Sequence, residues 1–109
     1  MPCEQPHDPQ DLDEVTALIN AAAADPATEI QYGYHADQRK EERQVNPIIV
    51  QRALREGEAR RVEIDNYRGR VTYRYRLVYE DQYGTIEPVV KILTNGALLV
   101  ITVIRKDRP

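Results

Sequence analysis

The sequence is short of several residue types that define common classes of small protein. Its 109 residues include one cysteine, Cys3, which excludes an internal disulfide and a zinc site built from cysteines. The longest apolar run, residues 97–104, is interrupted by Thr102 and is far shorter than the roughly 20 residues of a membrane span. Residues 1–10 have neither a basic start nor an apolar stretch, so we expect no signal peptide, no membrane partner and a cytoplasmic protein.

Lysine and arginine are absent from residues 1–30, which carry seven acidic residues. The rest of the chain holds all 15 basic residues and the other 11 of the 18 acidic ones, a balance of +4. The overall charge of −3 therefore combines an acidic head with a mildly basic body. Arginine clusters at 39–43, 52–61 and 68–76 could contact phosphates, although charged residues of this kind are more often simply solvated.

Hydrophobic periodicity predicts one helix after residue 11, capped by Asp11 and ended by Asp25-Pro26. A short strand follows around residues 30–34, and residues 35–45 have a helix-forming but almost wholly polar composition. Asn46, Pro47 and Gly57 are typical of the start and end of a further helix. From residue 59 the period changes to two, which predicts strands near 62–64, 71–79, 86–94 and 98–104.

Turn residues connect these strands in sequence, at 66–69, at 81–84 and at Asn95-Gly96, a pair typical of a type I′ turn. Pro88 predicts a sheet edge or a bulge, and the last strand, apolar on both faces, is expected inside the sheet. We therefore expect a flexible tail over residues 1–10 and a single α+β domain over 11–109, with N-terminal helices packed on one antiparallel meander.

The polar segment carries the residues best suited to chemistry. His35, Arg39 and Arg43 are spaced by four, which puts all three on one stripe of a helix. Histidine is the usual acid or base near neutral pH, and arginine forks fit phosphate oxygens. This combination suits RNA cleavage without a metal, since no metal-ligand spacing and no glycine-rich phosphate loop appear. The alternative is a solvated helix whose charges balance.

The run from His35-Ala36 through Arg39, Arg43 and Val45 to Gly57, with Ile101-Thr102-Val103 near the end, resembles a bacterial family of short uncharacterised domains. The resemblance covers about residues 28–105. This family is associated with the RelE-like ribonuclease toxins, a group that includes barnase-like and colicin-like nucleases and MqsR. Lys40 and Gln44 differ from the residues that are common in the family, and most RelE-like toxins are basic.

The resemblance implies a RelE-like architecture and an mRNA interferase-like RNA endonuclease without cofactor or metal. Its catalytic residues would be His35, Arg39, Arg43 and Thr102. It also implies RNA, including ribosome-bound mRNA, and a cognate antitoxin or immunity protein as partners. From the strand pattern alone, Arg74, Arg76 and Lys91 could guide RNA. A non-enzymatic protein-interaction module, or an RNA-binding module that does not cleave, remains the alternative.

Overall fold

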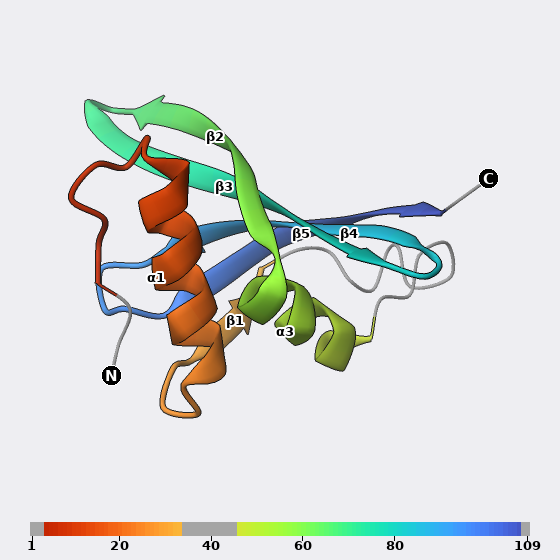
Figure 1. Ribbon diagram of the computed structural model, residues 1–109. Coiled ribbons are helices and arrows are strands. Elements are labelled where there is room, and N and C mark those ends of the chain that lie inside the picture. The colour runs from red at the N-terminus through yellow and green to blue at the C-terminus, as the bar shows by residue number, and fades with distance from the viewer. Residues whose placement is uncertain (1–3, 34–45, 108–109) are drawn as a thin grey trace.

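The computed structural model describes residues 4–33 and 46–107, in which two helices pack on one face of a five-stranded sheet (Figure 1). The helices are α1 (Leu12–Ala24) and α3 (Pro47–Glu56). The strands are β1 (Ile30–Tyr32), β2 (Glu58–Tyr67), β3 (Arg70–Asp81), β4 (Gly84–Ile92) and β5 (Leu98–Asp107). Their order in the sheet is β1-β5-β4-β3-β2. The chain is therefore α+β, and β2 to β5 form the expected meander.

Strand β1 makes the sheet mixed rather than purely antiparallel. It runs parallel to β5, with Ile30 opposite Leu98 and Tyr32 opposite Val100. The expectation of an antiparallel sheet is wrong at this edge, because alternation predicts a strand but contains no information about its direction. The interior position expected for β5 is confirmed, since it lies between β1 and β4.

Helix α1 begins with the predicted cap. The Asp11 side chain accepts hydrogen bonds from the backbone N–H groups of Asp13 and Glu14, which satisfies donors that the first helical turn leaves free. The Glu14 carboxylate accepts from the backbone N–H groups of Asp8 (3.0 Å) and His7 (2.8 Å). These two bonds lower the pKa of Glu14 and attach the preceding segment to the helix.

Helix α3 also has its predicted ends. Asn46 caps it through a hydrogen bond from Ile48 N–H, and Pro47 occupies the first turn. Gly57 ends it, with its N–H donating to the Ala53 carbonyl. A Cβ at Gly57 would lie 2.3 Å from that carbonyl oxygen, so close approach requires glycine here. The helix expected over residues 35–45, and Tyr34 of the expected strand, lie outside the described residues.

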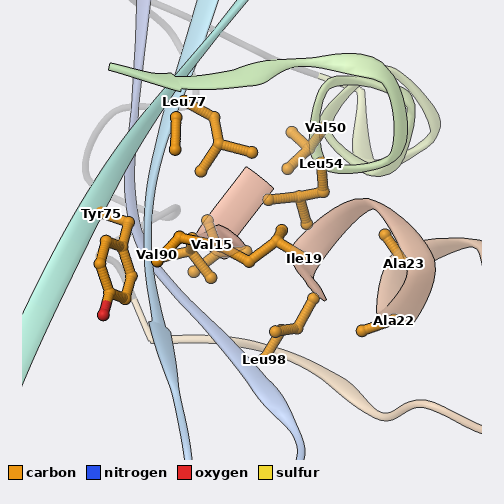
Figure 2. Close-up of a cluster of buried hydrophobic side chains, with 12 residues drawn as sticks. Val15, Ile19, Ala22, Ala23, Val50, Leu54, Tyr75, Leu77, Val90 and Leu98 are labelled. Carbon is orange, nitrogen blue, oxygen red and sulfur yellow. The ribbon is translucent and has the colours of Figure 1, made fainter. Parts of the chain in front are cut away.

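The core lies between the two helices and the sheet (Figure 2). The stripe predicted for α1 supplies Val15 and Ile19, and that of α3 supplies Val50 and Leu54, all four fully buried. The sheet contributes a larger set, which comprises Ala59, Tyr75, Leu77, Val90, Leu98 and Val100. Burying side chains of this size contributes about 1.5–3 kcal/mol each, so the helix-facing side of the sheet is the structural side.

The type I′ turn is at Arg68-Gly69 and not at Asn95-Gly96. Arg68 (φ 53°) and Gly69 (φ 78°) both have positive φ, as that turn requires. At the β4–β5 connection only Gly96 does, with φ 85°. The loop there is longer. Gly96 N–H donates to the Leu93 carbonyl and Leu93 N–H donates to the Ala97 carbonyl, both at 2.9 Å, and the Asn95 side chain adds a bond from Ala97 N–H at 3.0 Å.

Pro88 marks a bulge and not an edge, since β4 lies between β3 and β5. One residue after Pro88, between Val89 and Val90, the register with β5 shifts, so that Val89 is opposite Thr102 and Val90 is opposite Val100. The extra residue in β5 reverses its alternation. Thr102 therefore shares the face of Val89, on the side of the sheet away from the helices, and not the face of Val100 as simple alternation predicts.

Candidate functional site: the polar face of the sheet

The side of the sheet turned away from α1 and α3, which we call the polar face, carries most of the charged strand residues. No helix of the described residues lies on it (Figure 1). Alternation along β3 places Arg74 and Arg76 here, as predicted, because their neighbours Tyr75 and Leu77 are buried against the helices. The register of β2 places Glu63 opposite Arg74 and Asp65 opposite Thr72. Acidic and basic side chains thus meet across neighbouring strands.

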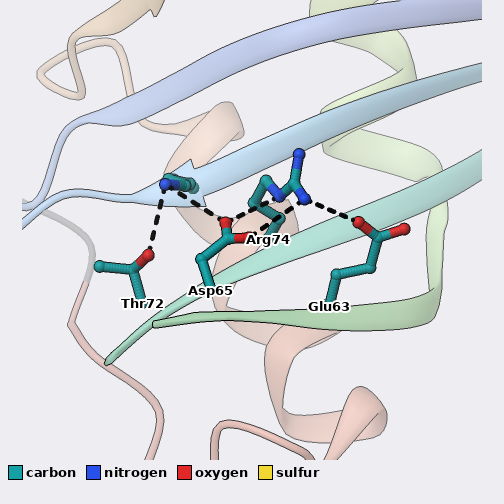
Figure 3. A network of polar contacts seen from close by, with 5 residues as sticks. Glu63, Asp65, Thr72 and Arg74 are labelled. Atoms are coloured by element: carbon teal, nitrogen blue, oxygen red, sulfur yellow. Dashed lines mark hydrogen bonds and ion pairs between the residues drawn. The ribbon is translucent and has the colours of Figure 1, made fainter. Parts of the chain in front are cut away.

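Arg74 is held by two carboxylates (Figure 3). Its Nη2 lies 3.0 Å from Glu63 Oε2 and donates a hydrogen bond to Asp65 Oδ1 at 3.1 Å. Its Nε lies 2.8 Å from Asp65 Oδ2, but the N–H does not point along this contact, which is an ion pair without a hydrogen bond. The guanidinium is therefore fixed in place and largely neutralised.

Lys91 joins the same group from β4. Its Nζ lies 3.6 Å from Asp65 Oδ2 and donates to Thr72 Oγ1 at 3.3 Å. The Asp65 carboxylate therefore lies between two cations, Arg74 and Lys91, which the strand pattern predicts as RNA contacts. The structure brings these two cations together.

Arg76 forms a separate and more buried pair with Glu87. Its Nε donates to Glu87 Oε1 at 2.7 Å, and its Nη2 lies 2.6 Å from the same oxygen. The other carboxylate oxygen accepts from Thr85 Oγ1 at 3.0 Å and lies 3.4 Å from Lys106 Nζ. Only 7% of the Glu87 side chain is exposed. Burial raises its pKa, but the hydrogen bonds from Thr85 and Arg76 and the nearby positive charges outweigh this and lower it.

The lowered pKa decides what Glu87 can do. Its carboxylate is ionised at neutral pH and is a weak base, because protonation would break its contacts with Arg76. Its effect is to hold Arg76 in position. Sequence reasoning missed Glu87, Glu63 and Asp65. Alternation alone would put Glu63 and Asp65 on the same strand face, but only the register shows which arginine each one meets.

A shallow cavity of about 300 Å³ is hollowed into the polar face next to β1. It is lined by Gly33, Asp65, Arg74, Lys91, Leu99 and Ile101. Gly33 N–H donates to the Val100 carbonyl at 2.9 Å, which places the end of β1 at this cavity. His35 follows Gly33 by two residues in the sequence.

Of the predicted catalytic residues, His35, Arg39 and Arg43 lie outside the described residues. Thr102 is half-buried on the polar face. Arg76, Val89 and Thr102 are successive partners across β3, β4 and β5, which separates Arg76 from Thr102 by two strand spacings, about 10 Å.

Within residues 4–33 and 46–107, no three histidine, cysteine or acidic side chains gather in a way that could hold a metal ion. None of the helices described there is long and apolar enough to cross a bilayer. Comparisons with protein-family models, curated proteins and solved structures find no match for the chain. The polar face is therefore interpreted from its own chemistry.

Proposed function

We propose that the protein is a metal-independent RNA endonuclease of the RelE-like toxin type, which acts in the cytoplasm and is controlled by a cognate antitoxin or immunity protein. One observation carries this proposal: the cavity on the polar face joins Arg74 and Lys91 to Gly33, two residues before His35 in the sequence. Two candidate phosphate-binding cations thus line a cavity together with the residue that precedes the candidate acid or base by two positions in the sequence.

In this proposal His35 removes the proton from an RNA 2′-hydroxyl, and the resulting oxygen attacks the adjacent phosphorus. Arg39 and Arg43 stabilise the charge that develops on the phosphate oxygens, and Thr102 orients one of them or a water molecule. An acid then protonates the departing 5′-oxygen. Arg74, Arg76 and Lys91 guide the strand toward this centre.

A protein-interaction module is the second candidate, and the ion pairs favour it. Arg74, Arg76 and Lys91 each contact a carboxylate of the sheet, so an RNA phosphate would compete with groups already in place. A protein surface with its own acidic and basic side chains could add to these pairs without displacing them.

Inducible expression tests the endonuclease directly. Wild type should arrest growth and fragment total RNA, and His35→Ala and Arg43→Ala should abolish both effects. His7→Ala is the matched control, because His7 is the other of the two histidines and contacts Glu14 through its backbone. Intact RNA and normal growth with well-expressed, folded wild type would overturn the proposal in favour of the interaction module.

Asp65→Asn tests whether RNA lies on the polar face. Removing this carboxylate leaves Arg74 paired only with Glu63 and takes away the carboxylate partner of Lys91. A short single-stranded RNA should therefore bind a few-fold more tightly, measured by fluorescence anisotropy in the His35→Ala background. Glu56→Gln makes the same change in net charge on α3, where Glu56 pairs with Arg52 and Arg55, and should leave affinity unchanged. Equal or weaker binding by Asp65→Asn would exclude this face as the RNA surface.

A further inference from the structure

The two hairpins of the sheet separate at one end and leave a gap between β3 and β4. These strands pair from Asp81↔Gly84 to Tyr75↔Val90 and no further. Beyond that point β3 stays paired with β2 as far as Arg70, and β4 stays paired with β5 as far as Ile92. In Figure 1 the turn end of the β2–β3 hairpin diverges from β4 and β5.

A cavity of about 540 Å³ lies in this gap, a volume in the range of small-molecule sites. Its walls are mainly apolar and aromatic, from Pro6, Val71, Tyr73, Tyr75, Ile92 and Leu93. Lys91 lines it as well and also lines the cavity on the polar face. The two cavities therefore share a cation.

Tyr75 supplies a hydrogen-bond donor at this cavity. The residue is 2% exposed, and Figure 2 shows its hydroxyl turned away from the apolar side chains of the core. No hydrogen bond joins this hydroxyl to any described residue, and its oxygen is not sealed from solvent, so it can donate to a molecule in the cavity. Burial, reinforced by Tyr73, Glu14 and Asp8, raises the pKa of Tyr75 to about 12, so the group stays protonated.

Two side-chain amides add polar groups of both kinds. Gln5 Nε2 donates to the carbonyls of Ile92 (3.2 Å) and Leu93 (3.0 Å), which attaches the segment expected to be a flexible tail to one wall and leaves the amide oxygen as an acceptor. Asn95 uses its amide oxygen to accept from Ala97 N–H and keeps its NH₂ group as a donor. Both residues line the cavity.

Positive charge completes the site. Arg70 lines the cavity, and among the described residues no carboxylate pairs with it. Flat aromatic walls, donors and acceptors at the edge, and a guanidinium that pairs with no carboxylate of the described residues fit a nucleobase with its phosphate. An acidic side chain of a partner protein could also pair with Arg70, but it has no aromatic ring that could stack on Tyr73.

We propose that the gap between β3 and β4 is a nucleobase-binding pocket that takes one base of an RNA strand while Arg70 and Lys91 hold its phosphate. This rests on the proposed function and extends it, because it assigns base selectivity to a site outside the catalytic segment. Tyr73 stacks on the base, and the Tyr75 hydroxyl donates to a base acceptor.

The four nucleoside 5′-monophosphates, titrated into ¹⁵N-labelled His35→Ala protein and followed by NMR, test the pocket without cleavage. At least one should shift the amide signals of Tyr73, Ile92 and Asn95 saturably, whereas ribose 5-phosphate, which lacks the base, should not. Tyr73→Ala should weaken binding about tenfold, and Tyr75→Phe, which keeps the core ring, should weaken it several-fold. Tyr83→Ala is the control, because Tyr83 is an exposed tyrosine in the turn at the opposite end of β3.

The spectra also report whether each variant is folded. The pocket proposal would be wrong if ribose 5-phosphate caused the same shifts as the nucleotides. It would also be wrong if the shifts persisted in folded Tyr73→Ala and Tyr75→Phe. RNA cleavage in cells, without any nucleotide-induced shift at these amides, would exclude the pocket and support the endonuclease. Base-dependent shifts without RNA cleavage in cells would support the pocket and exclude the endonuclease activity.

Discussion

Arg76→Met should expose how strongly the fold depends on the buried pair with Glu87. The substitution keeps most of the side-chain volume and leaves a carboxylate that is 7% exposed with only Thr85 and Lys106 as partners. Breaking a buried pair by removing one partner costs about 3–5 kcal/mol. Because two partners remain, we expect the lower end, about 3 kcal/mol at pH 7, from urea denaturation followed by circular dichroism.

Adding Glu87→Gln tests whether the cost comes from the stranded charge. A neutral amide can keep the contact with Thr85, so the double variant should regain at least about 1 kcal/mol relative to Arg76→Met. Arg105→Met is the control: the Arg105–Asp107 pair is 3.0 Å long but leaves 75% of the Asp107 side chain exposed, so its loss should cost less than about 1 kcal/mol.

The pH dependence of the stability difference between wild type and Arg76→Met is an independent test. In wild type the pKa of Glu87 lies below its ordinary value of 4.5, so its contribution is present above that value and is lost as pH falls through the lowered one. In Arg76→Met burial dominates and raises the pKa, so that variant loses stability as pH rises above 4.5. The two proteins should therefore differ less at pH 4 than at pH 7. A gap that does not change with pH, or a double variant no more stable than Arg76→Met, would refute this reasoning.

Two further substitutions, each with a control variant, test local geometry by the same denaturation assay. Gly84→Ala should cost more than about 2 kcal/mol, because φ is +148° and the new Cβ would lie 2.0 Å from the Lys106 carbonyl oxygen. Gly69→Ala, at φ +78° in open space, should cost only about 1 kcal/mol, and equal losses would contradict the clash. Thr16→Val should cost about 1–3 kcal/mol, because Thr16 Oγ1 accepts from Ala59 N–H at 2.9 Å; Thr16→Ser should stay near wild type, and a silent Thr16→Val would show that this donor finds another acceptor.

The helices could be predicted from the sequence because their signals are local. Asp11 caps α1, and Asn46, Pro47 and Gly57 begin and end α3, each acting on backbone groups a few residues away. The sheet was less predictable. At Asn95-Gly96 the residue pair favours a type I′ turn, but the Asn95 side chain bonds to Ala97 N–H and supports a longer loop.

The candidate site depends on register, and register is a property of pairs of strands. Alternation correctly puts Arg74 and Arg76 on one face of β3, which is all that a single strand can show. Whether such an arginine is free for phosphate depends on the residue opposite it, and here Glu63 lies opposite Arg74. One bulge after Pro88 likewise moves Thr102 to the polar face. A charged strand residue can therefore take a phosphate without giving up an existing ion pair only when its neighbours across the sheet leave it unpaired. Arg70 meets this condition among the described residues, whereas at Arg74, Arg76 and Lys91 a phosphate has to compete with a carboxylate.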